Sequence, residues 1–307
     1  MQGFELIPLQ KSHIFKMPEA TVLCLGNFDG VHIAHRALLD QAKRLRDTRF
    51  TDAACGVLCF RGLSSDFLQT TPPPHLFTDE DRLSAFADAG MDFAVMCDFP
   101  TLRHMSAQSF IDEILVGACH CVSAVCGFNY RFGDRGSGTP ELLRAHFGDR
   151  LHVEPPFLSD GVPVSSTRIR ALLLDGQAEE AARLLGRPYR FSSPVLHGKK
   201  LGRTIGIPTV NQAFPDMLLV PKRGVYITDC NVGERVYRGV SNVGSHPTVD
   251  NNAPVNCETY LLDFEGDVYG CEVEVSFLHY LRPEERFGSV DELKARIAQD
   301  IEKARTC

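Results

Sequence analysis

Long apolar runs are missing from the sequence. None approaches the roughly 20 residues that span a bilayer, and the first residues, MQGFELIPLQKSHIF, lack the long uncharged core of a signal peptide. We therefore expect a cytoplasmic protein. An excess of basic charge is missing as well, since the formal net charge is -7 at pH 7. Without a general positive field the chain is not expected to bind nucleic acid, so any phosphate must be held by local groups.

The pattern of a disulfide framework is also missing. The eleven cysteines form an odd set, scattered from Cys24 to Cys307 without a C-x-x-C pair. This spacing favours reduced, mostly buried thiols. Cys119, His120 and Cys121 are adjacent, but neighbouring residues on a strand point to opposite faces and no second ligand pair follows. The sequence therefore does not favour a structural zinc at this position.

Two domains are expected from the length and from a change of pattern along the chain. A chain of 307 residues exceeds the usual size of one hydrophobic core. In the first half, apolar runs at 21–26, 91–97 and 122–127 alternate with helical patterns, which predicts an α/β domain with a parallel sheet. Ligands of such sheets lie at the carboxyl ends of the strands.

The second half has a different pattern. β-rich runs such as GVYITDCNV and CEVEVSFLHYL are separated by Gly, Asn and Asp at intervals of roughly ten residues, which favours an antiparallel barrel or sandwich. A final helix is expected to begin at a capping box of Ser289 and Glu292. Its apolar stripe, which would pack on this domain, consists of Leu293, Ile297, Ile301 and Ala304. The helix stop at Gly186 marks the expected domain edge, which gives domains of 1–186 and 187–307.

The segment CLGNFDGVHIAH, residues 24–35, joins a predicted strand to a predicted helix. Gly26 ends the strand and Gly30 permits a tight turn, so the backbone can run close to a ligand. His32 and His35 then lie in or near the first turn of the helix, where free N–H groups favour an anion and imidazoles can donate to phosphate oxygens. The segment therefore predicts a phosphate site. The alternative is that one histidine caps the helix and the other is exposed.

Two further segments carry groups that suit phosphate chemistry. VSSTRIR, residues 164–170, offers hydroxyls and an arginine at a helix N-terminus, although SSTR alone is usually an N-cap. In GKKLGRTIGIPTVNQ, residues 198–212, a proline fixes the turn before Thr209 and Asn211, which lie on one side of an extended segment. These side chains would supply oxygen ligands for Mg²⁺ or donors for a phosphate. The alternative is a Pro-Thr turn that leads into a strand.

Together, these motifs resemble one family. GNFDGVHIAH resembles the G-x-F-D-G-x-H-x-G-H signature of the nucleotidyltransferase superfamily. GFNYRFG (127–133) and VSSTRIR resemble the flavin-contacting loop and the S-S-T-x-I-R element of bacterial bifunctional riboflavin kinase/FAD synthetases. The kinase domain of that family is similar to GIPTVN followed by SNVGSHPTV, VNCETYLLDF, DVYG and LRPEERFGSVDELKARIAQD. The resemblance covers roughly residues 15–305 and implies a Rossmann-like nucleotidyltransferase domain before an antiparallel riboflavin kinase barrel.

The resemblance implies roles for residues of the first half. His32 and His35 would hold ATP phosphates, and Asp29 would also contribute to a metal site. The nucleotide would be lined by Gly26, Asn27 and Asp29. Asn129 and Arg131 would face the flavin. The triphosphate would be clamped by Ser165, Ser166, Thr167 and Arg168.

The resemblance also implies how the second half works. Glu258 would be the catalytic base, because phosphoryl transfer to a primary alcohol needs a group that accepts the hydroxyl proton. A lone glutamate in a strand is otherwise ordinarily a solvated surface residue. Thr209 and Asn211 would bind Mg²⁺, and Gly206 and Pro208 would belong to the same nucleotide site.

The implied activities are ATP-dependent phosphorylation of riboflavin to FMN and adenylylation of FMN to FAD, both with Mg²⁺. The chain departs from the family pattern at Ala34, where the signature has glycine, and after Phe60, where RGLSSDF replaces a stretch that contains Pro-His-Pro. Two alternatives therefore stay open. One is a riboflavin kinase whose first domain has lost adenylylation, and the other is a flavin carrier or sensor that binds without turnover.

Overall fold

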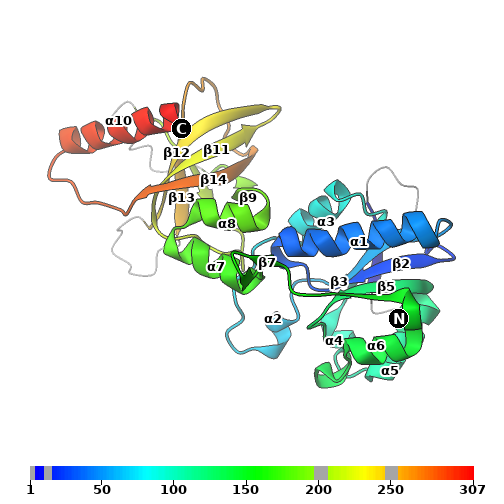
Figure 1. Cartoon of the computed structure of the whole chain (residues 1–307). Helices are drawn as coiled ribbons and strands as arrows, with labels where there is room; N and C mark the ends of the chain where they lie inside the picture. Colours follow the sequence, from blue (N-terminus) through cyan, green and yellow to red (C-terminus); the bar gives the residue numbers. More distant parts are fainter. Residues whose placement is uncertain (1–3, 10–15, 197–206, 246–254) are drawn as a thin grey trace. The chain divides into compact units, whose positions relative to one another are not determined.

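A computed structural model describes residues 4–9, 16–196, 207–245 and 255–307 of the chain (Figure 1). The contacts divide the chain into two compact units, Met1–Ser166 and Thr167–Cys307. The second unit begins with helices α7 (Ser166–Asp175) and α8 (Ala178–Leu185), which precede its first strand. The expected domain edge at 186/187 falls between α8 and that strand.

A six-stranded sheet forms the centre of the first unit. Its strand order is β1-β4-β3-β2-β5-β6, and all neighbouring pairs are parallel except β1 with β4. The strands are β1 (Phe4–Pro8), β2 (Thr21–Leu25), β3 (Ala54–Phe60), β4 (Phe93–Cys97), β5 (Cys121–Gly127) and β6 (Leu151–Glu154). Because helices cover both faces, β2 and β4 are buried along their whole length, which explains their continuous apolar sequence. The predicted α/β domain with a parallel sheet is confirmed.

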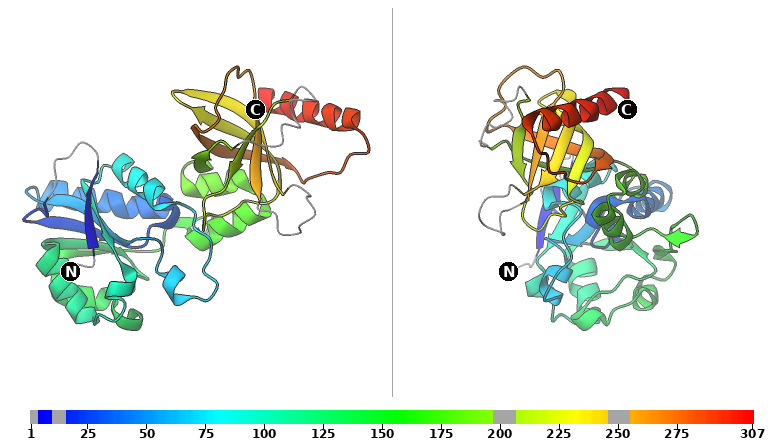
Figure 2. Two further views of the ribbon diagram at one scale, coloured as in Figure 1. Left: turned by 180° about the vertical axis from the view of Figure 1, so that it is seen from behind. Right: turned by 90° about the vertical axis from the view of Figure 1, so that its left-hand side faces the viewer.

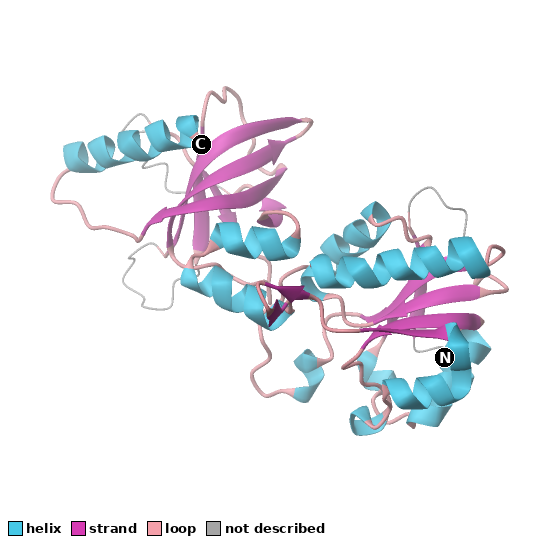
Figure 3. Cartoon of the chain, in the orientation of Figure 1, coloured by secondary structure: helices cyan, strands magenta, loops and turns pink. Residues whose placement is uncertain are grey.

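Helices lie on both faces of this sheet (Figure 3). The helices of the unit are α1 (Ile33–Arg49), α2 (Ser65–Leu68), α3 (Asp79–Asp88), α4 (Phe99–Leu102), α5 (Ala107–Ser109) and α6 (Pro140–Phe147), with the π-helix η2 (Phe110–Ala118) and the 3-10 turns η1 (Asp29–Val31), η3 (Asp134–Gly136) and η4 (Gly148–Arg150). A short hairpin of β7 (Leu158–Ser159) and β8 (Val162–Pro163) precedes the end of the unit.

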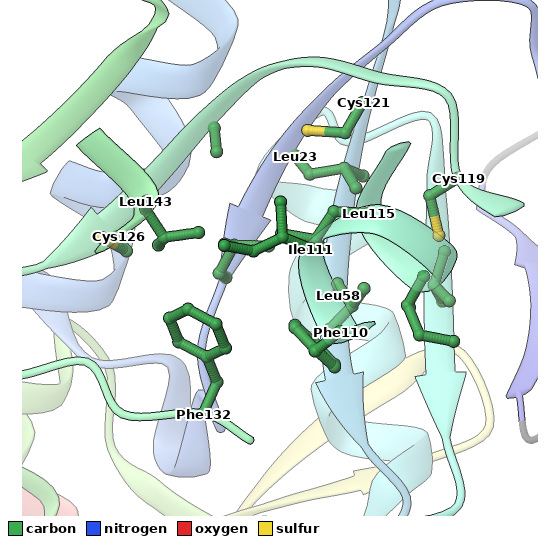
Figure 4. Close-up of a cluster of buried hydrophobic side chains, with 14 of the residues drawn as sticks. Leu23, Leu58, Phe110, Ile111, Leu115, Cys119, Cys121, Cys126, Phe132 and Leu143 are labelled. Atoms are coloured by element: carbon green, nitrogen blue, oxygen red, sulfur yellow. The ribbon is translucent and has the colours of Figure 1, made fainter. Parts of the chain in front are cut away.

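A core cluster of the first unit lies between the sheet and η2. Figure 4 shows Phe110, Ile111 and Leu115 of η2 beside Leu23 and Leu58 of the sheet. All three η2 side chains are buried. The helix is a π-helix, and it ends with a bond from the Cys119 N–H to the Ile114 carbonyl at 2.9 Å, five residues back.

The cysteines are distributed as their spacing predicts. All eleven are free thiols, nine of them buried and only Cys271 and Cys307 exposed. Burial raises the pKa of Cys59 to about 11 and that of Cys119 to about 12. These side chains therefore act as small apolar residues that fill the core.

The second unit is built on an antiparallel six-stranded sheet. Its order is β10-β13-β12-β11-β14-β9, and its strands are β9 (Tyr189–Pro194), β10 (Val210–Ala213), β11 (Gly224–Val232), β12 (Arg235–Gly244), β13 (Asn256–Leu261) and β14 (Glu272–Arg282). The two edges approach each other at a bridge, where the Leu196 N–H donates to the Asn211 carbonyl at 2.7 Å. The Gln212 side chain also donates to the carbonyls of Ser193 and Val273, both at 2.7 Å. These bonds bring the sheet close to a closed barrel, as predicted.

Helix α10 (Val290–Thr306) lies against the strands of this unit (Figure 2). Ala304 belongs to a buried cluster that includes Val225 and Leu262, and Ile301 packs against it, which confirms the C-terminal half of the predicted stripe. Leu293 and Ile297, the other two members, are half-buried. The predicted capping box is only half formed. Ser289 accepts the Glu292 N–H at 3.2 Å, but the Glu292 carboxylate accepts from the N–H of Gly288, not from that of Ser289.

A buried ion pair also holds α10. Asp300 is 1% exposed, and its Oδ2 accepts two bonds from the Arg282 guanidinium, at 2.8 and 3.0 Å. Arg282 ends β14 and is 8% exposed. Because a buried charge is costly unless it is paired, each member of this pair depends on the other.

We expect Asp300→Ala to destabilise the second unit by about 3 kcal/mol, since it leaves the buried Arg282 without its main partner. Urea unfolding, followed by circular dichroism, would measure this loss. Glu302→Ala, a substitution at an exposed position on the same helix, is the control and should change stability little. Equal unfolding midpoints for the two variants would contradict the role given to the pair.

Candidate functional site

The turn between β2 and α1 has an unusual backbone. Phe28, Gly30 and Val31 have φ values of 56°, 79° and 38°, all in the left-handed region. Gly30 adopts this conformation at no steric cost, whereas Phe28 and Val31 are strained. Phe28 is 1% exposed, and a side chain at Gly26 would come within 3.1 Å of its ring. The turn is thus held tightly between the end of a central strand and the start of a helix.

The two predicted histidines lie against each other at the start of α1. His32 is the N-cap residue, and its Nδ1 accepts the His35 N–H at 3.3 Å. The rings stack with centroids 3.6 Å apart and an angle of 13° between their planes. One histidine therefore caps the helix, as the alternative interpretation predicted, but the other stacks on it at the same turn.

Burial, followed by the charge of His32, lowers the pKa of His35 well below its ordinary value of 6.5. His35 is therefore neutral near pH 7. Its Nδ1 is buried and has no hydrogen-bond partner among the residues that the structure describes. A neutral imidazole carries one N–H donor and one acceptor, so this residue can bond to a ligand without adding charge to the turn.

Asn27 and Asp29 are tied to the segment that follows β3. The Asn27 side chain, which is exposed, donates to Ser64 Oγ at 3.1 Å. Asp29 is 3% exposed, and its Oδ1 accepts the N–H groups of Leu76 and Phe77 at 2.9 and 3.2 Å. Part of the Asp29 carboxylate therefore serves the fold of the turn.

The S-S-T-R element reaches the same turn. Ser166 Oγ donates to the carbonyl oxygen of Asp29 at 3.0 Å, so two predicted segments 137 positions apart in the chain meet within the first unit. Ser165 is half-buried and Thr167 is exposed. Arg168 belongs to the second unit, where its guanidinium lies 3.5 Å from Glu180 of α8.

The predicted flavin loop follows β5. Asn129 and Arg131 are exposed, whereas Phe132 is buried, and the rings of Tyr130 and Phe132 stack with centroids 5.6 Å apart. The loop is fixed by a bridge between Phe132 and Gly138. This alternation directs both predicted polar side chains away from the core at the carboxyl end of a central strand.

In the second unit, a row of polar residues crosses three strands. Asn211 of β10 is directly opposite Glu258 of β13, which is directly opposite Asn242 of β12. Directly opposed residues on neighbouring strands project from the same face of a sheet. Glu258 is half-buried on this face, while its neighbours Cys257 and Thr259 are buried on the other.

Thr209 lies two residues before Asn211, and both are half-buried. Pro208, next to Thr209, is exposed, and Gly206 lies outside the described residues. The structure therefore brings Asn211 and Glu258 into register, as a joint site requires. Asn242 was not singled out from the sequence, and only its cross-strand pairing identifies it. Its amide donates to Glu284 at 3.3 Å.

Comparison with known proteins identifies the family of the chain. A family model described as FAD synthetase matches residues 14–168, and one described as riboflavin kinase matches residues 185–307. Two curated relatives, from Listeria monocytogenes and Escherichia coli, are each 35% identical to this chain and are named bifunctional riboflavin kinase/FMN adenylyltransferase. The alignments cover 92% and 94% of this chain, and 91% and 92% of the relatives. The chain belongs to the family of bifunctional riboflavin kinase/FMN adenylyltransferases.

A solved structure has the same architecture over the whole chain. It is titled a macrolide-efflux protein from Streptococcus pneumoniae and matches with a TM-score of 0.87 at 31% identity, covering 98% of this chain and 99% of that one. In the part of this chain that the structure describes, no helix combines the length and apolar character needed to cross a membrane.

The neutral state of His35 predicts a pH-dependent stability. The folded state resists protonation of His35, while the unfolded chain takes up a proton near pH 6.5, so wild-type stability should fall as the pH drops below 6.5. His35→Gln lacks this proton uptake. The difference in melting temperature between variant and wild type should therefore shift in favour of the variant from pH 8 to pH 5.

The control is His104→Gln, since the His104 side chain is 79% exposed. Its melting temperature should follow that of the wild type at both pH values. A His35→Gln variant whose difference from the wild type is the same at pH 5 and pH 8 would contradict the assignment of a neutral imidazole at this position.

Proposed function

We propose that the second unit phosphorylates riboflavin to FMN and that the first unit joins FMN to the AMP part of ATP, releasing pyrophosphate. The observation that carries the kinase assignment is the register of Asn211 with Glu258. For adenylyl transfer, the support is the meeting of the His32 turn with Ser166. We retain 186/187 as the functional boundary, since it lies beside the start of the riboflavin kinase match at residue 185.

In the kinase reaction, Glu258 acts as the general base. It accepts the proton of the terminal ribityl hydroxyl as the oxygen attacks the γ-phosphorus of ATP, and the bond from that phosphorus to the departing ADP breaks. Oxygen atoms of Thr209 and Asn211 suit Mg²⁺, which when bound neutralises charge on the triphosphate. Gly206 and Pro208 belong to the same nucleotide-binding segment. The direct pairing of Asn211 with Glu258 on neighbouring strands supports these two roles, because a metal ligand and a base of one site must lie close together.

In adenylyl transfer, the first unit binds and orients two anions. A phosphate oxygen of FMN attacks the α-phosphorus of ATP, and the bond to the departing pyrophosphate breaks. Imidazole N–H groups of His32 and His35 donate to the phosphates, together with backbone N–H groups near Gly26 and at the start of α1. Because negative charge grows on the leaving pyrophosphate, fixed donors at this turn lower the barrier without a covalent intermediate.

The remaining residues bind the two substrates. Asn27 lines the nucleotide, and Asp29 contributes to the metal site. Asn129 and Arg131 contact the flavin. The triphosphate is held by Ser165, Ser166, Thr167 and Arg168.

Glu258→Gln should reduce FMN formation from riboflavin by about 10² to 10⁴-fold, because the amide cannot accept the proton. FAD formation from supplied FMN should continue at the wild-type rate. Both are measured by incubating the protein with ATP, Mg²⁺ and the flavin and then separating the flavins by chromatography.

The exposed Glu272→Gln on β14 is the matched control and should behave as the wild type. An undiminished kinase rate in Glu258→Gln would show that another group is the base. The same chromatography separates the alternatives for the wild-type protein. FAD from riboflavin is expected, FMN alone would indicate a kinase without adenylylation, and unchanged riboflavin would indicate a carrier.

His32→Asn should lower FMN adenylylation by roughly 10²-fold, because it removes an imidazole donor from the phosphates. Asparagine is itself a good N-cap residue, so α1 should keep its stability. The kinase rate of the same preparation tests whether the protein is intact. His120→Asn, at an exposed position in the same unit, is the control. Wild-type adenylylation by His32→Asn would remove the turn from the active site.

A further inference from the structure

One of the largest fully buried side chains in the protein is charged. Arg82 lies in α3 and is 1% exposed. Burying an arginine is unfavourable unless its guanidinium is both paired and hydrogen-bonded. Arg82 meets both conditions, and its partners are the strand ends around the turn that carries His32.

The guanidinium of Arg82 bonds to four partners. One NH₂ group donates to the Asn27 carbonyl at 2.8 Å. The other donates to the carbonyls of Phe60 and Gly62, at 2.8 and 2.9 Å, and to the Asp79 carboxylate. Asn27 follows β2, whereas Phe60 and Gly62 are at and just beyond the end of β3. A single side chain thus fixes the backbone at the carboxyl ends of two neighbouring parallel strands.

Other bonds join the same two segments. Asn27 Nδ2 donates to Ser64 Oγ at 3.1 Å. Asp29 Oδ1 accepts the backbone N–H groups of Leu76 and Phe77. The Asp79 carboxylate, paired with Arg82, also accepts the Gly62 N–H at 3.1 Å. The turn at 26–30 and the segment 61–78 therefore form one hydrogen-bonded structure. This segment is where the sequence departs from the Pro-His-Pro pattern.

We propose that Arg82 and Ser64 are positioning residues for adenylyl transfer. Arg82 holds the Asn27 backbone and Ser64 holds the Asn27 side chain, so together they set how the strained turn presents its N–H groups and His32 to the phosphates of ATP. Arg82 acts through the carbonyls that it binds. This inference rests on the proposed assignment of the turn to ATP.

The physical argument concerns the geometry of the Asn27 peptide. A displacement of about 1 Å in an active site can reduce the rate by about 10²-fold. Lysine keeps the charge beside Asp79, but its ammonium is a point donor and does not reproduce the planar fork that reaches carbonyls on two strands. Arg82→Lys should therefore preserve the ion pair and loosen the link between the strand ends.

The test measures kcat and KM for ATP in FMN adenylylation by Arg82→Lys and Ser64→Ala. For Arg82→Lys we expect a loss of about 10- to 100-fold in kcat/KM for ATP. For Ser64→Ala, which removes one exposed hydrogen bond, we expect a smaller loss of about threefold, seen mainly in KM for ATP. The riboflavin kinase rate of each preparation should stay at the wild-type value.

Arg46→Lys is the matched control. Arg46 lies in the last turn of α1 and bonds to Asp92 at 3.2 Å, so it is a partly buried arginine of the same unit with a carboxylate partner. Asp92 precedes β4, at the amino end of a strand rather than the carboxyl end. This variant should keep the wild-type KM for ATP even where its melting temperature falls.

The outcomes separate this inference from the site assignment. The positioning role would be overturned if Arg82→Lys and Ser64→Ala both had the wild-type kcat/KM for ATP while His32→Asn was impaired. The assignment of the turn to the active site would then still stand. Wild-type activity in all three would overturn the site itself. If Arg82→Lys does not fold, Ser64→Ala alone decides. If Arg46→Lys lost as much kcat/KM for ATP as Arg82→Lys, the loss would come from general destabilisation of the unit, and the inference would be overturned.

Discussion

A buried charge must be surrounded by hydrogen-bonding partners, and this constraint organises both units of the protein. In the first unit, Asp29 and Arg82 are almost fully buried. Asp29 accepts backbone N–H groups from the segment before α3, and Arg82 donates to backbone carbonyls at the ends of β2 and β3. In the second, Arg282 and Asp300 join the end of the long strand β14 to α10. The rigid strands and the functional loops are thus joined by charges that cannot be moved without leaving a partner unsatisfied.

The two units arrange phosphate chemistry in different ways. In the first, a strained turn and a helix N-terminus offer backbone N–H groups together with two stacked imidazoles. In the second, the candidate groups come from neighbouring strands whose register aligns Asn211 with Glu258. A turn suits a reaction that depends on fixed donors. A pleated sheet suits one that needs a base and a metal ligand side by side, because the pleat sets their separation.

The sequence predicted what depends on local pattern. Apolar runs located β2, β4 and β5. The sequence motifs singled out Asn211 and Glu258, which the structure brings into register. The sequence did not predict contacts between side chains and partners that are distant in the chain. Nothing near Arg82 in the chain shows that its partners are Asn27 and Phe60, and the stripe of α10 gave no sign that Asp300 would be buried beside Arg282. The capping box was half right because Glu292 had a second acceptable donor one residue further back, at Gly288.

The thiols have a consequence for handling the protein. A thiolate is the reactive form of cysteine, and desolvation keeps the buried cysteines protonated at neutral pH. Alkylating reagents and peroxide should therefore react only with Cys271 and Cys307, which both belong to the second unit. A fluorophore attached through maleimide chemistry would then report on the second unit alone, and the α/β unit would stay unlabelled without any cysteine having been replaced.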